Sequence, residues 1–244
     1  MLKKLENKVV FITNGSGFWG KTLSQLFQEH GAKIILGVPI LTEHTPQVLK
    51  TDNTLEIPIH YTQETSWDNA LTIANSTFGQ IDVLINSFDP ATTRQTINAL
   101  DKIFHQTLQN QLSSVFLAVK SVIPYFQATG GGSIVNLVSI YANIGSPNSL
   151  ALASSDGGVR TLSKSVAVQY AKYNIRSNCI LMGVFTNSMS GGKGNENISP
   201  ITNIPMARSG HPRELSHVVL YLSSKDSWYI TGTEIVVDGG LSSA

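Results

Sequence analysis

The fold is decided by residues 9–20, which read VVFITNGSGFWG. The apolar run at residues 9–12 predicts a buried strand, and Leu23, Leu26 and Phe27 fall on one face of a helix after residue 20. The turn between them is rich in Gly, Ser and Asn, and its backbone N–H groups and the helix dipole can both face a phosphate. Strand, glycine turn and helix together predict the first βαβ unit of a Rossmann fold.

Composition places the chain among ordinary α/β domains. It has 244 residues, is 41% hydrophobic and 14% charged, and carries a formal net charge of +1, so one large domain with a sizeable core is expected. The near-neutral charge gives no electrostatic argument for nucleic acid or a membrane surface as partner. A single cysteine, Cys179, excludes an internal disulfide, and we expect a cytoplasmic protein without a signal peptide or a membrane span.

Strand and helix patterns alternate along the rest of the chain, which predicts a doubly wound, seven-stranded parallel sheet with helices on both faces. The later helices are expected over about 67–78, 100–126, 151–173 and 212–222, with Pro124 kinking or closing the second of them. The segment between residues 37 and 54 is expected to hold at most one short helix. The six strands predicted after the first are 33–36, 57–59, 82–86, 133–138, 179–181 and 234–237.

The glycine turn resembles the Thr-Gly-x-x-x-Gly-x-Gly motif of the short-chain dehydrogenase/reductase family. Thr13 and Gly20 occupy their places, whereas Asn14 and Phe18 replace the other two glycines. Residues 82–86, including Asn86, together with 131–139, 174–178 and 229–240, resemble later segments of the same family. The resemblance implies a single domain over residues 1–244 and a substrate lid within 184–210, for which an ordinary surface loop is the alternative. It also implies a homodimer or homotetramer built on the helices over 100–126 and 151–173.

The positions that carry chemistry in this family are altered. The family places a Tyr thirteen residues after its catalytic Ser and a Lys four residues after that Tyr. Here Ser139 stands at the Ser position, Leu152 at the Tyr position and Asp156 at the Lys position. Leucine has no titratable proton, and an aspartate brings a negative charge where the family has a positive one. The resemblance therefore predicts a scaffold without the conventional proton-transfer pair.

Cofactor positions are altered as well. Val38 and Pro39, after the second strand, have neither the carboxylate that binds an NAD ribose nor the Arg that binds an NADP phosphate. His60 stands where the family has an adenine-contacting Asp, and Gln111, beside Asn110, where it has the Asn of the proton relay. We therefore expect no cofactor, although NAD(P) is not excluded.

A second resemblance is narrower. The pattern Thr13-Asn14-x-x-x-Phe18-x-Gly20 is similar to the turn of the halohydrin dehalogenases, relatives that use no nicotinamide and fill the cofactor space with an aromatic residue. The same turn, with Asn86, is then a possible small-anion site, because its N–H groups still face outward. Those enzymes use Ser, Tyr and Arg, of which only Ser139 is present.

Four residues remain as candidates for site chemistry, each with a structural alternative. Ser139 can hydrogen-bond a substrate oxygen or local backbone. Asp156 is a general base with a raised pKa if it is buried alone, or a partner of Arg160 one turn on. Tyr141 is expected to line the pocket, and Gln111 to orient a water or to pack. No histidine spacing suits a metal.

These observations leave three hypotheses. The chain is a non-redox member that binds a small-molecule ligand or serves as a partner subunit, a nicotinamide-independent dehalogenase-like lyase, or an atypical NAD(P)-dependent oxidoreductase. The first is preferred from the sequence because it requires none of the missing groups.

Overall fold

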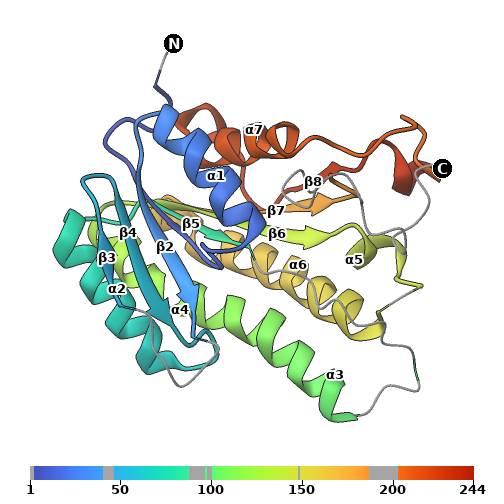
Figure 1. The fold of residues 1–244 in the computed structure, drawn as a ribbon, viewed down its shortest axis with the longest axis horizontal. Coiled ribbons are helices and arrows are strands. Elements are labelled where there is room, and N and C mark those ends of the chain that lie inside the picture. Colours follow the sequence, from blue (N-terminus) through green and yellow to red (C-terminus); the bar gives the residue numbers. More distant parts are fainter. Residues whose placement is uncertain (1–2, 41–46, 88–96, 98–100, 148, 187–202) are drawn as a thin grey trace.

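The computed structural model describes residues 3–40, 47–87, 97, 101–147, 149–186 and 203–244. These residues form one twisted sheet with helices on both faces (Figure 1). The strand order is β3-β4-β2-β1-β5-β6-β7-β8, and every pair is parallel except β3 with β4. The expected doubly wound α/β class is confirmed.

The first half of the chain builds one side of the sheet. Its elements are β1 (Val9–Ile12), α1 (Phe18–Glu29), β2 (Lys33–Pro39), β3 (Leu49–Lys50), β4 (Thr54–Ile59), α2 (Glu64–Phe78) and β5 (Val83–Asn86). The four residues of β1 are all buried, because a central parallel strand has helices over both of its faces.

The second half extends the sheet from β5. Its elements are α3 (Asp101–Leu108), the π-helical turn η1 (Gln109–Ser113), α4 (Ser114–Ala128), β6 (Gly132–Ser139), α5 (Tyr141–Ile144), α6 (Leu150–Tyr170), η2 (Ala171–Tyr173), β7 (Ile175–Met182), α7 (Pro212–Ser223), η5 (Lys225–Ser227), β8 (Glu234–Val237) and η6 (Leu241–Ser243). The core has two layers: α1 and α7 cover one face of the sheet, and α2, α4 and α6 cover the other (Figure 1).

Three details of the sequence prediction are wrong. Within the described residues the sheet has eight strands rather than seven, because β3 pairs antiparallel at the edge, in the segment expected to hold at most one short helix. The helix expected over 100–126 is interrupted by the π-helical turn η1. Pro124 lies inside α4, which continues to Ala128, so closure of the helix at this proline is wrong, whereas a kink there stays a prediction.

The order of strands fixes the position of the site. β1 pairs with β2 on one side and with β5 on the other, so the chain reverses direction across the sheet between β1 and β5. Ligands of open α/β sheets bind in the crevice at the carboxyl ends of the strands at such a switch point. The turn after β1, Asn86 at the end of β5 and Ser139 at the end of β6 all lie along this edge.

Candidate functional site

The glycine turn after β1 keeps the shape that the sequence predicts. A Cβ on Gly20 would lie 2.5 Å from the Gly15 carbonyl oxygen, and a Cβ on Gly15 would lie 2.4 Å from the Leu36 Cβ, so both positions require glycine. Asn14 has φ 51°, a left-handed conformation that asparagine tolerates better than most residues. The replacement of the family's first glycine by Asn14 is therefore compatible with the turn.

The first turn of α1 has no side-chain cap. Gly17 caps the helix without a side-chain hydrogen bond, so the first amides of α1 keep their N–H groups for another partner. Phe18 packs its ring edge-on against Trp19 at 5.0 Å and joins the apolar cluster under the sheet, where Trp19 meets Phe185 at 5.3 Å. The Phe18 side chain thus contributes to the packing of this layer.

Two buried polar residues, Asn86 and Ser87, lie at the carboxyl end of β5. The Asn86 amide donates to Asn136 Oδ1 over 2.8 Å, and the Thr13 hydroxyl accepts the Ser87 N–H over 2.8 Å. The Asn86 Oδ1 and Ser87 Oγ atoms are buried and have no hydrogen-bond partner among the described residues. Because buried polar atoms are nearly always satisfied, these two mark a place where a bound polar group belongs.

Tyr61, which the sequence did not single out, holds the turn to the sheet. Its hydroxyl donates to the Gly37 carbonyl oxygen over 2.7 Å and accepts the Asn14 N–H over 2.6 Å. Burial raises the pKa of Tyr61, an effect that the Asn14 hydrogen bond partly offsets. The signal was present in the sequence, since Tyr61 continues the alternation of Ile57 and Ile59 beyond β4.

Replacing Tyr61 by phenylalanine is expected to lower the free energy of unfolding by about 1–3 kcal/mol, because the Asn14 N–H and the Gly37 carbonyl lose their partner. Urea unfolding of the variant measures this loss. Tyr125→Phe, a change of the same size on α4, is the control, and an equal effect in both variants would contradict the role given to Tyr61.

Ser139 and Asp156 are brought together at the carboxyl end of β6. Asp156 lies on α6 and its Oδ2 accepts the Ser139 N–H over 2.9 Å. The Ser139 hydroxyl accepts the Tyr141 N–H over 3.2 Å, so the local backbone contact foreseen for this serine is present, while its hydroxyl hydrogen is not used by that bond. Leu152, on the same helix, is buried.

The Asp156 carboxyl is buried and has a raised pKa. Its residue is 6% exposed, and burial raises its pKa to about 7, with the Ser139 N–H acting in the opposite direction. The expected alternative, an ion pair with Arg160, is wrong. Arg160 instead donates to Glu234 Oε2 over 2.7 Å and to the Ala142 carbonyl over 2.6 Å, because its side chain runs toward β8. Asp156 is therefore able to exchange a proton near neutral pH.

The remaining expected residues lie on other elements of the fold. Tyr141 begins α5 and is half-buried against the core, as expected of a lining residue. Gln111 is half-buried on η1, and this turn approaches α6 where a Cβ on Gly158 would lie 2.8 Å from Leu112 Cδ2. Val38 and Pro39 end β2, and His60 is exposed. Most of the expected lid, residues 187–202, lies outside the described residues.

Glu234 is a further residue that the sequence did not indicate. It begins β8 and contacts both Arg160 and Lys164 of α6, at 2.7 and 2.5 Å. Since Arg160 also holds the Ala142 carbonyl, this cluster ties α6 and the short helix α5 to the last strand.

No helix in the described residues is long and apolar enough to cross a membrane.

The chain is similar to several known proteins. A family model described as enoyl-(acyl carrier protein) reductase matches residues 15–242. The chain is 30% identical to the 3-oxoacyl-[acyl-carrier-protein] reductase FabG of Thermotoga maritima, over 98% of this chain and 99% of that protein. It is also 30% identical to a 7alpha-hydroxysteroid dehydrogenase of Paraclostridium sordellii, over 98% and 93% of the two chains.

A solved structure gives the same result. The crystal structure of a putative short-chain dehydrogenase/reductase from Burkholderia xenovorans superimposes with a TM-score of 0.86, covering 99% of each chain at 25% identity. The named relatives are reductases and dehydrogenases, so the preferred expectation of a non-redox ligand-binding or partner subunit is wrong, and the dehalogenase-like alternative is not favoured. By its matched residues, its relatives and its fold, the chain belongs to the short-chain dehydrogenase/reductase family.

Proposed function

We propose that this protein is an oxidoreductase that interconverts a secondary alcohol and a ketone, with Asp156 as the group that exchanges the proton. The names of the relatives support this class of reaction, since 3-oxoacyl reductases and hydroxysteroid dehydrogenases both act at a carbonyl or hydroxyl carbon. The observation that carries the assignment of Asp156 is its buried carboxyl, hydrogen-bonded to Ser139 and with a pKa of about 7.

The described residues fit the diphosphate of a nicotinamide dinucleotide. A Cβ at Gly15 or Gly20 would disrupt the turn, and the first amides of α1 have no side-chain cap. Asn86 Oδ1 and Ser87 Oγ are buried without a hydrogen-bond partner among the described residues. The backbone of residues 13–20, with Asn86 and Ser87, would hold this group. The nicotinamide ring of the bound dinucleotide would supply or accept the hydride.

The proton that is exchanged with the substrate oxygen comes from, or goes to, a residue of the chain itself. For ketone reduction, neutral Asp156 gives its proton to the carbonyl oxygen as the carbon receives the hydride, and Asp156 is left as a carboxylate. For alcohol oxidation, the carboxylate removes the hydroxyl proton instead. In this proposal the Ser139 hydroxyl donates a hydrogen bond to the same oxygen, which stabilises the charge that develops there. Leu152 keeps this side of the site apolar.

The proposal is tested by measuring oxidation of NADH and NADPH by the purified chain in the presence of a 3-oxoacyl thioester, a 7-oxo steroid and simple cyclic ketones. We expect turnover with at least one ketone and its loss in Asp156→Asn. If no ketone is reduced and calorimetry shows no binding of either nucleotide, the proposal is wrong. Turnover that is retained in Asp156→Asn would contradict the role of Asp156 alone.

A further inference from the structure

Two side chains of α6, one turn apart, hold the segment that carries the Ser139 hydroxyl. Asp156 Oδ2 accepts the Ser139 N–H over 2.9 Å, and the Arg160 guanidinium donates to the Ala142 carbonyl over 2.6 Å. Between these two points, the Tyr141 N–H donates to the Ser139 hydroxyl over 3.2 Å. The hydroxyl therefore belongs to a stretch of backbone that α6 holds at both ends.

The Ala142 carbonyl depends on Arg160 for its donor. The helix α5 is a single turn, and the N–H groups at its end bond to the carbonyls of Ile140 and Tyr141. Among the described residues, no backbone N–H donates to the Ala142 carbonyl. Since the last carbonyls of a helix have no partner within it, the guanidinium takes the place of the missing backbone donor.

Glu234 fixes the position of the Arg160 guanidinium. Its Oε2 accepts from Arg160 Nη2 over 2.7 Å, and the two side chains are only 21% and 18% exposed. A partly buried, charge-assisted bond of this kind defines the geometry of a side chain better than an ion pair at the surface does. Arg160 thus connects the last strand of the sheet, through α6, to the short helix that follows Ser139.

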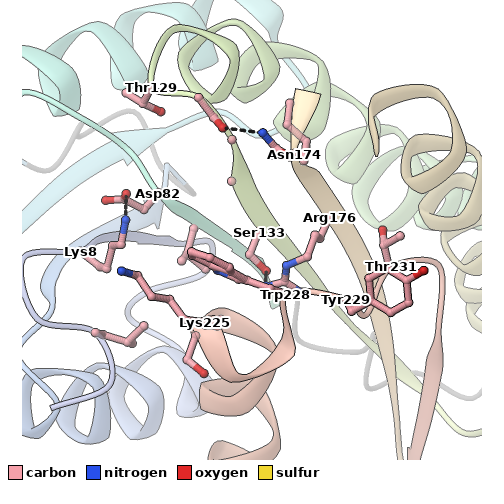
Figure 2. A pocket seen from close by; sticks show the side chains of 18 of the residues that line it. Lys8, Asp82, Thr129, Ser133, Asn174, Arg176, Lys225, Trp228, Tyr229 and Thr231 are labelled. Carbon is pink, nitrogen blue, oxygen red and sulfur yellow. Dashed lines mark hydrogen bonds and ion pairs between the residues drawn. The ribbon is translucent and has the colours of Figure 1, made fainter. Parts of the chain in front are cut away.

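Arg176 makes similar contacts at the other edge of the sheet and serves as a comparison. It lines a pocket of about 780 Å³ at the amino ends of β6 and β7 (Figure 2), and it donates to the Ile230 and Leu222 carbonyls over 3.0 and 2.6 Å. Ser139 does not line this pocket. Arg176 therefore joins elements away from the candidate site, whereas Arg160 acts on the segment that carries the serine.

We propose that Arg160 is a positioning residue of the candidate active site, which orients the Ser139 hydroxyl toward the substrate oxygen by holding α5 at the Ala142 carbonyl. The inference rests on the proposed function, in which that hydroxyl stabilises the charge on the oxygen. Arg160 acts through α5 and is not itself a catalytic group. A misplacement of about 1 Å at a reacting centre can cost about 10²-fold in rate, so the loss of this support is measurable.

The first test is steady-state kinetics of Arg160→Met on the ketone that the parent chain reduces. We expect kcat to fall about tenfold or more and KM to change less than about threefold, because the Ser139 bond acts mainly in the transition state. Arg160→Lys keeps the charge and a donor but not the planar fork, so it should recover part of the loss. Glu234 retains Lys164 as a partner in both variants, so no carboxylate is left unpaired.

Lys164→Met is the matched control, because Lys164 pairs with the same Glu234 carboxylate at 2.5 Å but is not bonded to the Ala142 carbonyl. It should leave kcat unchanged. An equal fall of kcat in Lys164→Met and Arg160→Met would overturn the proposal, since the loss would then follow the ion pair and not the contact with α5.

Hydrogen–deuterium exchange of residues 139–146, followed by mass spectrometry, gives a second readout that needs no turnover. These amides should exchange about tenfold faster in Arg160→Met than in the parent chain, the effect of one lost charge-assisted bond on local opening, and at the parent rate in Lys164→Met. Unchanged exchange in Arg160→Met, or faster exchange with unchanged kcat, would overturn the proposal. If the parent reduces no ketone, the proposed function is wrong, while exchange still decides whether Arg160 orders α5.

Discussion

Replacing Asp156 by asparagine should lower kcat/KM for ketone reduction by about 10²–10⁴-fold, the usual contribution of a general acid. The amide is nearly the same size and keeps an oxygen for the Ser139 N–H, so the carboxyl proton is the main loss. Steady-state kinetics on the substrate found in the panel measure the effect. Asp68→Asn, on the exposed face of α2, is the control.

The pH dependence gives the same prediction a second readout. Because burial raises the Asp156 pKa to about 7, the protonated acid required for reduction is lost as the pH rises through 7, and kcat/KM should fall. The carboxylate required for alcohol oxidation forms over the same range, so that rate should rise. Profiles in which both directions change alike around pH 7 would assign the proton to another group.

A pH-dependent loss of stability is the second large effect expected at Asp156. A carboxyl with a pKa of 3.8 when unfolded and about 7 when folded favours the native state fully below pH 4 and loses this contribution as the pH rises to 7. The difference of about three pKa units corresponds to at most about 4 kcal/mol. The native protein therefore bears the cost of an ionised, buried Asp156 above pH 7.

Urea unfolding at pH 5 and pH 8 tests this. Asp156→Asn should show a smaller decrease in the free energy of unfolding between these values than the parent chain, because the amide does not ionise. A variant that is more stable at pH 8 yet nearly inactive would separate catalysis from folding. An identical pH dependence in both proteins would show that Asp156 is not a strained ionisable group.

The general fold could be predicted because its signals are local and repeated. The apolar runs of β1 and β5 and the turn at residues 13–20 each define their element with little tertiary context. The edge strand β3 was missed because its two residues are both exposed, so no burial pattern marks it. The π-helical turn η1 was missed because one additional residue in a turn shifts the helical period without changing the composition.

The site was only partly predictable for a different reason. Alignment of Ser139, Leu152 and Asp156 along the chain identified which groups replace the family's catalytic pair, and the structure brings two of them together. The sequence alone does not determine which group a buried carboxyl pairs with. Arg160, one turn from Asp156 on α6, instead binds Glu234, 74 residues further along the chain. Inference from missing motif residues also overestimated the loss of redox function, since relatives over nearly the whole chain are named as oxidoreductases.

The two outer strands of the sheet have a consequence for behaviour at high concentration. β3 has two residues and β8 has four, and β3 also carries Lys50 at its end. A free strand edge is a template on which another molecule can add by backbone hydrogen bonding, and short, charged edges resist this. We therefore expect little tendency of the native protein to aggregate by sheet extension, despite central strands that are fully buried and mostly apolar.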